Sequence, residues 1–144
     1  MYKRILVPTD GSEITAKAVE TAISLARLTG AELYAMAVKE PFPFSTISEM
    51  QPAPPQEFYD EQERIASRRV KDVVDAAKTA AVAVHGHTVE AASPWEAIID
   101  HAKSQDCDLI VMASHGRRGF SALLLGSETQ KVLTHSSLPV LVVR

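Results

Sequence analysis

The feature that most restricts the fold is an unbroken apolar run late in the chain. Residues Leu109–Ala113 read Leu-Ile-Val-Met-Ala, with no polar residue among them. A strand that is apolar at every position is typical of the buried centre of a parallel sheet. Arg4–Val7 has a similar apolar, β-branched character and stops at Pro8. We therefore expect these two segments to be the central strands of a parallel sheet.

Segments with helical periodicity separate the strands. After Ser12, a good N-cap, apolar residues recur at helical spacing and predict a helix over residues 13–29 that ends before Gly30. Ser93-Pro94-Trp95-Glu96 has the pattern of a capping box and predicts another helix start. Further helices are expected over about 57–82 and 127–135, and further strands over 32–38, 88–92 and 139–143.

The order of these elements predicts the fold class. Five strands alternating with four helices indicate an α/β fold with an open five-stranded parallel sheet and helices on both faces. Residues 88–92 alternate apolar and polar side chains, so this strand is expected at an edge. The 144 residues fit a single domain, residues 1–144.

Composition excludes several classes of function. The net charge of −3 argues against nucleic acid as the main partner. The single cysteine, Cys107, excludes an intramolecular disulfide and a cysteine-based zinc site, and we expect it to be packed rather than reactive. No apolar run approaches membrane-spanning length, which predicts a cytoplasmic protein. Five prolines between residues 40 and 56 predict a loop, either a lid or a plain surface connection.

The segment after Leu109–Ala113 looks suited to hold an anion. It reads Ser-His-Gly-Arg-Arg-Gly over residues 114–119, and Gly126-Ser127 then begins a helix. Glycines let backbone N–H groups approach a phosphate, and the first turn of a helix adds unpaired donors. Ligands of such sheets bind where the strand order reverses. If the two apolar strands are neighbours, Thr9 and Asp10 face the same crevice as residues 114–119.

Each of these residues also has a purely structural interpretation. Asp10 is a common turn residue, and Gly116 and Gly119 could supply turn conformations. His115 has no partner at a spacing that suggests catalysis. The other histidines form no metal-binding pattern, and no Gly-x-x-x-x-Gly-Lys-Ser/Thr phosphate loop is present.

Three segments together resemble the universal stress protein family. They are Ile-Leu-Val-Pro-Thr-Asp-Gly-Ser at residues 5–12, Ser-His-Gly-Arg-Arg-Gly followed by Leu-Leu-Leu-Gly-Ser, and the closing Leu-Pro-Val-Leu-Val-Val. The resemblance runs through the whole chain in the same order. It implies strand order 3-2-1-4-5, frequent dimers, and a division into members that bind ATP and members that do not.

ATP-binding members share a motif of Gly, two residues, Gly, nine residues, then Gly and Ser or Thr. Here nine residues separate Gly116 from Gly126-Ser127, and Ala113 stands where the first glycine is expected. Alanine adds one methyl group, which could crowd a ribose or phosphate. We expect this departure to weaken binding mildly.

The resemblance also implies individual contacts. Asp10, with Pro8 and Thr9 beside it, approaches the ribose and adenine; Val38 meets the adenine through its backbone; Met112 and Ala113 line the pocket floor. The phosphates are surrounded by Gly116, Arg117, Gly126, Ser127, Glu128 and Thr129. The charge of Glu128 suits a helix N-terminus but repels phosphate, so its side chain should point away.

These features lead to one favoured function and two alternatives. The resemblance implies an adenine nucleotide, ATP, AMP or ADP, with or without Mg²⁺, bound by a sensor or regulator of the stress response. One alternative is a slow ATP hydrolase or phosphotransferase that uses His115 or Ser127. The other is an interaction scaffold that no longer binds nucleotide because of Ala113.

The last strand predicts a homodimer. Residues Pro139–Val143 are apolar on both faces, and no later segment of the chain can cover their outer edge. An uncovered edge strand exposes unpaired N–H and C=O groups and invites association. Two-fold pairing of this strand between two subunits satisfies both edges, and the family resemblance points the same way.

Overall fold

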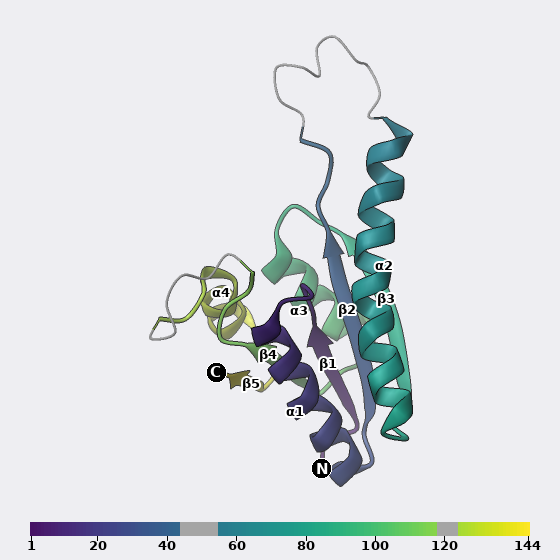
Figure 1. The fold of residues 1–144 in the computed structure, drawn as a ribbon. Helices are drawn as coiled ribbons and strands as arrows, with labels where there is room; N and C mark the ends of the chain where they lie inside the picture. The colour runs from purple at the N-terminus through teal and green to yellow at the C-terminus, as the bar shows by residue number, and fades with distance from the viewer. Residues whose placement is uncertain (44–54, 118–123) are drawn as a thin grey trace.

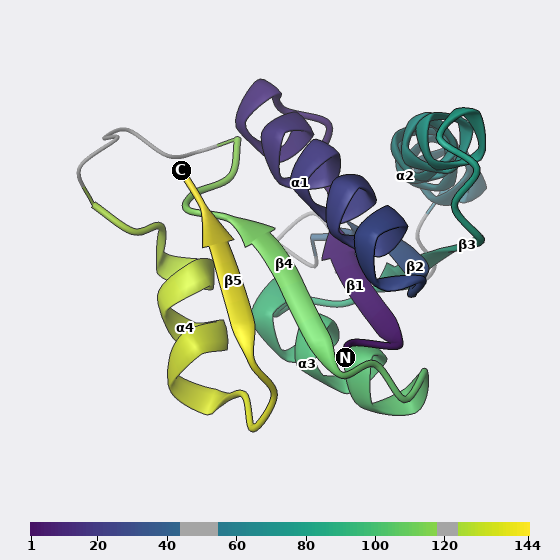
Figure 2. The same ribbon diagram turned by 90° about the horizontal axis from the view of Figure 1, so that it is seen from below.

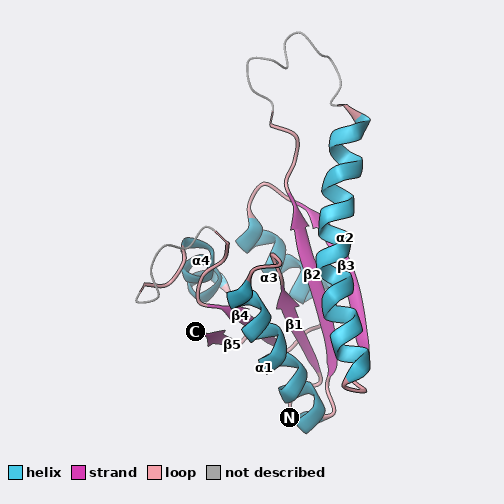
Figure 3. Cartoon of the chain, viewed as in Figure 1, coloured by secondary structure: helices cyan, strands magenta, loops and turns pink. Residues whose placement is uncertain are grey.

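The structure of the chain is a computed structural model, which describes residues 1–43, 55–117 and 124–144. Its elements, in chain order, are β1 (Arg4–Pro8), α1 (Glu13–Thr29), β2 (Glu32–Lys39), α2 (Gln56–Thr79), β3 (Val84–Glu90), α3 (Pro94–Ser104), β4 (Leu109–Ala113), α4 (Ser127–His135) and β5 (Val140–Val143). Figures 1 and 3 show this alternation of strands and helices. Most of the predicted 40–56 loop, as well as Arg118 and Gly119, lies outside the described residues.

The five strands form one parallel sheet in the order β3-β2-β1-β4-β5. This confirms the predicted fold class and strand order. β1 pairs with both β2 and β4, so the order reverses between β1 and β4. β3 lies at one edge, as its alternating pattern predicted, and β5 lies at the other. Figure 2 shows α1 and α2 on one face of the sheet and α3 and α4 on the other.

β4 and the Ile5–Val7 part of β1 are apolar at every position because both faces of these strands are covered. Ile5 and Val7 belong to the core on the side of α1 and α2. Leu6, between them, belongs to the core on the side of α3 and α4. All three side chains are fully buried. β4 repeats this arrangement, with Val111 on the first side and Ile110 on the second.

The predicted boundaries of β3 were wrong. We expected residues 88–92, but β3 begins at Val84 and ends at Glu90. The missed segment holds Gly86, a poor strand former in sequence terms. The structure explains this glycine, because a β-carbon there would lie only 2.5 Å from Val70 Cγ1 on α2. The bare backbone therefore lets α2 pack closely on β3.

Other predicted features are confirmed with small changes. α1 and α4 have the expected bounds, and Ser12 caps α1, while α2 ends at Thr79 rather than near Val82. β5 begins at Val140, one residue late. Cys107 is buried, and burial raises the pKa of its thiol to about 12, so the thiol is packed and protonated. No helix in the described ranges is long and apolar enough to cross a membrane.

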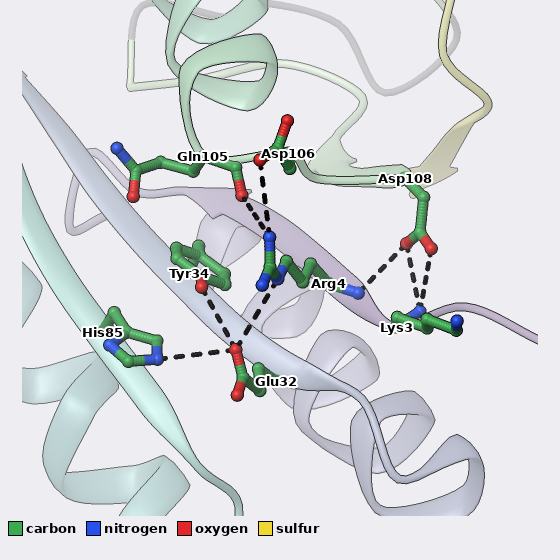
Figure 4. Close-up of polar contacts among 8 residues, drawn as sticks. All are labelled: Lys3, Arg4, Glu32, Tyr34, His85, Gln105, Asp106 and Asp108. Carbon is green, nitrogen blue, oxygen red and sulfur yellow. Dashed lines mark hydrogen bonds and ion pairs between the residues drawn. The ribbon is translucent and has the colours of Figure 1, made fainter.

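The N-terminal ends of the strands carry a connected set of charges (Figure 4). Arg4, on β1, lies 3.8 Å from Glu32 on β2 and 3.6 Å from Asp106. The Asp108 carboxylate accepts backbone N–H groups of Lys3 and Arg4 at 2.9 and 3.1 Å. Glu32 also accepts the Tyr34 hydroxyl and lies 3.6 Å from His85 Nε2. At this end of the sheet, cationic and anionic groups are paired with one another.

Candidate functional site

The loops that follow β1 and β4 meet at the C-terminal end of the sheet. The backbone N–H of Arg117, after β4, donates to Asp10 Oδ2, after β1. The Arg117 guanidinium also donates from Nη2 to the Asp10 carbonyl oxygen at 3.0 Å. The two loops therefore meet at the point where the strand order reverses, as predicted from the apolar strands, and we refer to this junction as the crevice.

The Asp10 carboxylate is held by a set of short hydrogen bonds. Its Oδ1 accepts the Ser12 backbone N–H at 2.9 Å and the Thr15 hydroxyl at 2.7 Å. Burial raises the pKa of Asp10, but the hydrogen bonds from Ser12, Thr15 and Arg117 outweigh it, so the pKa lies below its usual value. Asp10 is therefore an ionised group in a fixed position.

Gly116 and Gly126 are required because neighbouring atoms lie too close for a β-carbon, and not because the backbone adopts a left-handed turn conformation. A β-carbon at Gly116 would lie 2.7 Å from Asp10 Oδ2. A β-carbon at Gly126 would lie 3.0 Å from His115 Cα, and the Gly126 N–H donates to the Ser114 carbonyl at 2.7 Å. Neither glycine has a φ in the left-handed region. The interpretation that Gly116 supplies a turn conformation is therefore wrong, because Gly116 makes room for Asp10.

The first turn of α4 presents one hydroxyl and several backbone donors. The hydroxyl of Thr129, which is buried, donates to the Ala113 carbonyl at 2.9 Å and fastens α4 to the end of β4. Ser127 is exposed, and its hydroxyl has no hydrogen-bond partner among the described residues. Of these two side chains, only that of Ser127 is available to a ligand.

Glu128 points away from the crevice, as its charge predicted. Its Oε2 accepts the backbone N–H of Trp95 at 2.9 Å, in the first turn of α3. Ser93 was predicted to cap α3, but its side chain makes no capping hydrogen bond. Glu128 is the residue that caps this turn, across the space between two helices. A capping box read from nearby sequence cannot show such a long-range partner.

The remaining predicted site residues lie at or below the crevice. Thr9 is buried, its N–H donates to the Met36 carbonyl, and its hydroxyl accepts the Gly11 N–H. Pro8 ends β1, and Val38 is half-buried near the end of β2. Met112 and Ala113 are buried at the end of β4, beneath the Ser114–Arg117 loop. The structure thus brings all the predicted positions to the same end of the sheet.

His115 shows no catalytic network. Its Nδ1 lies 3.2 Å from the hydroxyl of its neighbour Ser114, and no carboxylate orients the ring within the described ranges. No group of three or more His, Cys, Asp or Glu side chains among the described residues could hold a metal ion. His87 and His101 do contact each other at 3.3 Å, but they form only a pair.

Arg69 was not predicted to lie in this region. This α2 residue reaches the loop after β1, where a β-carbon on Gly11 would lie 3.1 Å from Arg69 Cγ. Gly11 has a φ of +77°, which favours glycine in any case. In the sequence, Arg69 belongs to the charged face of a long amphipathic helix, and such a residue is ordinarily a solvated one.

Two open grooves lie elsewhere on the surface. One, of about 430 Å³, runs between α2 and β3, and the other, of about 450 Å³, runs between β3 and α3. Neither is lined by the residues that converge after β1 and β4. We place the candidate site at the crevice, because three features meet there: backbone without side chains at the two glycines, a helix N-terminus and a fixed carboxylate.

Comparison with known proteins identifies the family. The universal stress protein family model matches residues 1–144. Universal stress protein MJ0531 of Methanocaldococcus jannaschii is 34% identical over 145 residues, which is all of this chain and 83% of the relative. The solved structure of hypothetical protein MJ0577, also from M. jannaschii, has a TM-score of 0.84 at 29% identity and covers 99% of this chain and 96% of that one.

A third relative was solved with a bound ligand. It is the crystal structure of a universal stress protein in complex with cAMP, with a TM-score of 0.75 at 25% identity, covering 99% of this chain and 97% of that one. The family match spans every residue, and the solved relatives share the overall fold. The chain belongs to the universal stress protein family.

Proposed function

We propose that this protein binds an adenine nucleotide in the crevice between the ends of β1 and β4. The observation that carries this proposal is the junction of Asp10 with the Gly116–Arg117 backbone, directly beside the N-terminus of α4. The junction sets a fixed carboxylate, suited to ribose hydroxyls, next to backbone donors suited to phosphate. The related structure in complex with cAMP supports the same ligand class.

The proposed roles follow the placement of the residues. Asp10 binds the ribose, Pro8, Thr9 and the Val38 backbone contact the adenine side, and Met112 and Ala113 form the floor. The phosphates of ATP, ADP or AMP lie against the backbone of Gly116, Arg117 and Gly126 and bind the N–H groups of the first turn of α4, from Ser127, Glu128 and Thr129, together with the Ser127 hydroxyl. The N–H groups of Arg117 and Gly126 already donate to Asp10 and Ser114 and hold the loop in place. We expect any Mg²⁺ to be bound by the phosphate oxygens of the nucleotide.

We further propose that binding serves sensing or regulation in the cytoplasm, with residues 1–144 acting as one universal stress protein domain. His115 lacks an orienting partner among the described residues, and this favours binding over rapid hydrolysis. The steady-state rate of ATP hydrolysis with Mg²⁺ distinguishes a regulator from an ATP hydrolase, because a regulator releases phosphate far more slowly than it exchanges nucleotide.

The test is binding by the purified protein and two glycine variants. Nucleotide released on denaturation, and calorimetric titration with ATP, should both show binding to the wild type. Gly116→Val and Gly126→Val should abolish it, because the new side chains displace Asp10 Oδ2 and the His115 backbone. Ala92→Val, at an exposed position after β3, is the matched control and should bind normally. Unchanged affinity in both glycine variants would contradict the proposed cradle.

We also propose a homodimer formed by the edge strand within Pro139–Val143. The carbonyls of Pro139 and Val143 accept N–H groups from Ile110 and Ser114, so the odd-numbered residues face β4. In a parallel ladder the even-numbered residues, Val140 and Val142, then direct their backbone groups to the outer edge. Leu141→Pro would therefore break the β4–β5 pairing rather than the dimer.

Val142→Pro is the informative change for the dimer, because it removes an outward N–H. We expect sedimentation to show a dimer for the wild type and a monomer for Val142→Pro, with Val142→Ile as the control that keeps the donor. A wild-type monomer at micromolar concentration would contradict the proposed dimer.

A further inference from the structure

Two arginine side chains from distant elements approach the same point beside the crevice. A β-carbon on Gly11 would lie 3.2 Å from Nε of Arg69, on α2, and 3.3 Å from Nη2 of Arg117, after β4. Gly11 is exposed and carries no side chain, so the two guanidinium groups converge over bare backbone. The loop that they cover is the one that holds Asp10.

Neither guanidinium is neutralised within the described part of the chain. The Arg117 guanidinium donates only to the Asp10 backbone carbonyl, and the Arg69 guanidinium forms no hydrogen bond or ion pair there. Two other arginines, Arg64 and Arg4, do have carboxylate partners. Arg64 on α2 pairs with Glu61 at 2.6 Å, and Arg4 on β1 lies within ion-pair distance of both Glu32 and Asp106.

Two like charges held side by side repel each other, and an anion placed between them relieves that repulsion. Guanidinium groups present a planar fork of donors that matches phosphate oxygens. Arg69 is half-buried, and a side chain that is already restricted loses less entropy when it binds.

We propose that Arg69 and Arg117 form a two-arginine clamp that binds a phosphate group at the outer end of the crevice. The inference rests on the proposed nucleotide binding and adds to it a residue from α2 that lies outside the glycine motif. The group it binds is the terminal phosphate of a nucleoside di- or triphosphate. The clamp makes the site prefer a long phosphate chain over AMP or adenosine.

The test compares the affinities of ATP, AMP and adenosine in matched variants. Arg69→Gln removes the charge, Arg69→Lys keeps the charge but loses the fork, and Arg68→Gln removes the neighbouring, exposed charge of the same helix. We expect Arg69→Gln to weaken ATP binding by roughly tenfold or more, as for a lost charge-assisted hydrogen bond. The affinity of Arg69→Gln for adenosine should not change. The ATP affinity of Arg69→Lys should lie between those of the wild type and Arg69→Gln, and Arg68→Gln should bind ATP as the wild type does.

The outcomes separate this inference from the function on which it rests. If the wild type binds ATP and Arg69→Gln binds it equally well, the clamp is wrong and the nucleotide site stands. If Arg69→Gln weakens adenosine as much as ATP, Arg69 is structural and the clamp is wrong. If the wild type binds no nucleotide, inorganic tripolyphosphate decides: binding that Arg69→Gln abolishes supports the clamp, and no binding overturns it.

Discussion

The two ends of the parallel sheet carry similar charged residues in opposite arrangements. At the N-terminal end, Arg4 is paired with Glu32 and Asp106, and the Asp108 carboxylate accepts the N–H groups of Lys3 and Arg4 (Figure 4). At the C-terminal end, Asp10 is held by uncharged N–H and hydroxyl groups. The guanidinium groups of Arg69 and Arg117 lie beside this loop without a carboxylate partner in the described residues.

This difference shows how one fold separates stability from binding. Charges that are paired internally tie neighbouring strands together and leave little for a ligand. Where hydrogen-bond donors have no acceptor within the protein, they remain available to bind an anionic ligand. In a parallel sheet the strand C-termini are the place for such donors, because the loops there lead into helix N-termini with unpaired N–H groups.

The sharpest test removes one carboxylate at each end of the sheet and compares the effects on nucleotide binding and on stability. Asp10→Ala should weaken nucleotide binding by about 1–3 kcal/mol, because ligand groups lose a charged partner. Asp108→Ala should lower the free energy of unfolding by about 1–3 kcal/mol, because two backbone donors lose their acceptor. Nucleotide titration and urea unfolding of both variants measure the four values. If Asp108→Ala impairs binding as strongly as Asp10→Ala does, the division between the two ends is wrong.

A smaller effect should appear in the pH dependence of stability. The folded-state pKa of Asp10 is lowered, so its carboxylate stabilises the fold above the unfolded-state value near 3.8. That contribution is lost as the pH falls through the lower, folded-state pKa. We therefore expect Asp10→Asn to be less stable than the wild type at neutral pH, with the difference shrinking at acidic pH. Urea unfolding across this range measures the difference, and a constant gap would contradict the assignment.

The smallest expected effect concerns Ala113, which occupies the first position of the glycine motif. Ala113 is buried at the end of β4, and its carbonyl oxygen accepts a hydrogen bond from the Thr129 hydroxyl. Ala113→Gly should leave ATP affinity unchanged or tighten it modestly, because it removes one methyl group. It should also lower the free energy of unfolding by about 0.5–1 kcal/mol, since glycine weakens a strand. A large loss of affinity in calorimetry would show that alanine belongs to the shape of the pocket.

The sequence predicted those parts of the fold that depend on local pattern. The apolar runs of β1 and β4 placed them at the centre, and the nine residues between Gly116 and Gly126 marked the two sides of the crevice. β3 was misplaced because His85, Gly86 and His87 have no apolar alternation. Their strand conformation depends on pairing with β2 and on close packing of α2, neither of which is visible in local sequence.

The site was predicted less completely, for a related reason. Glu128, Thr129 and Gly116 were correctly placed near the crevice, but their partners come from distant segments. Glu128 binds the N–H of Trp95, Thr129 binds the Ala113 carbonyl, and Gly116 makes room for Asp10. Arg69 was missed because nothing in the sequence of α2 indicates which of its charges turns towards the loop after β1.

The pairing of β1 with β4 also has a consequence for the order of events during synthesis. The hydrogen bond between Asp10 and Arg117 joins residues 107 positions apart. While the chain leaves the ribosome, β1, α1, β2 and β3 can associate long before β4 exists, but the crevice closes only when most of the polypeptide has emerged. Such distant contacts form late because the intervening loop must first lose its entropy. A nascent chain that stalls before β4 thus lacks β4 and β5 and has no place for a ligand.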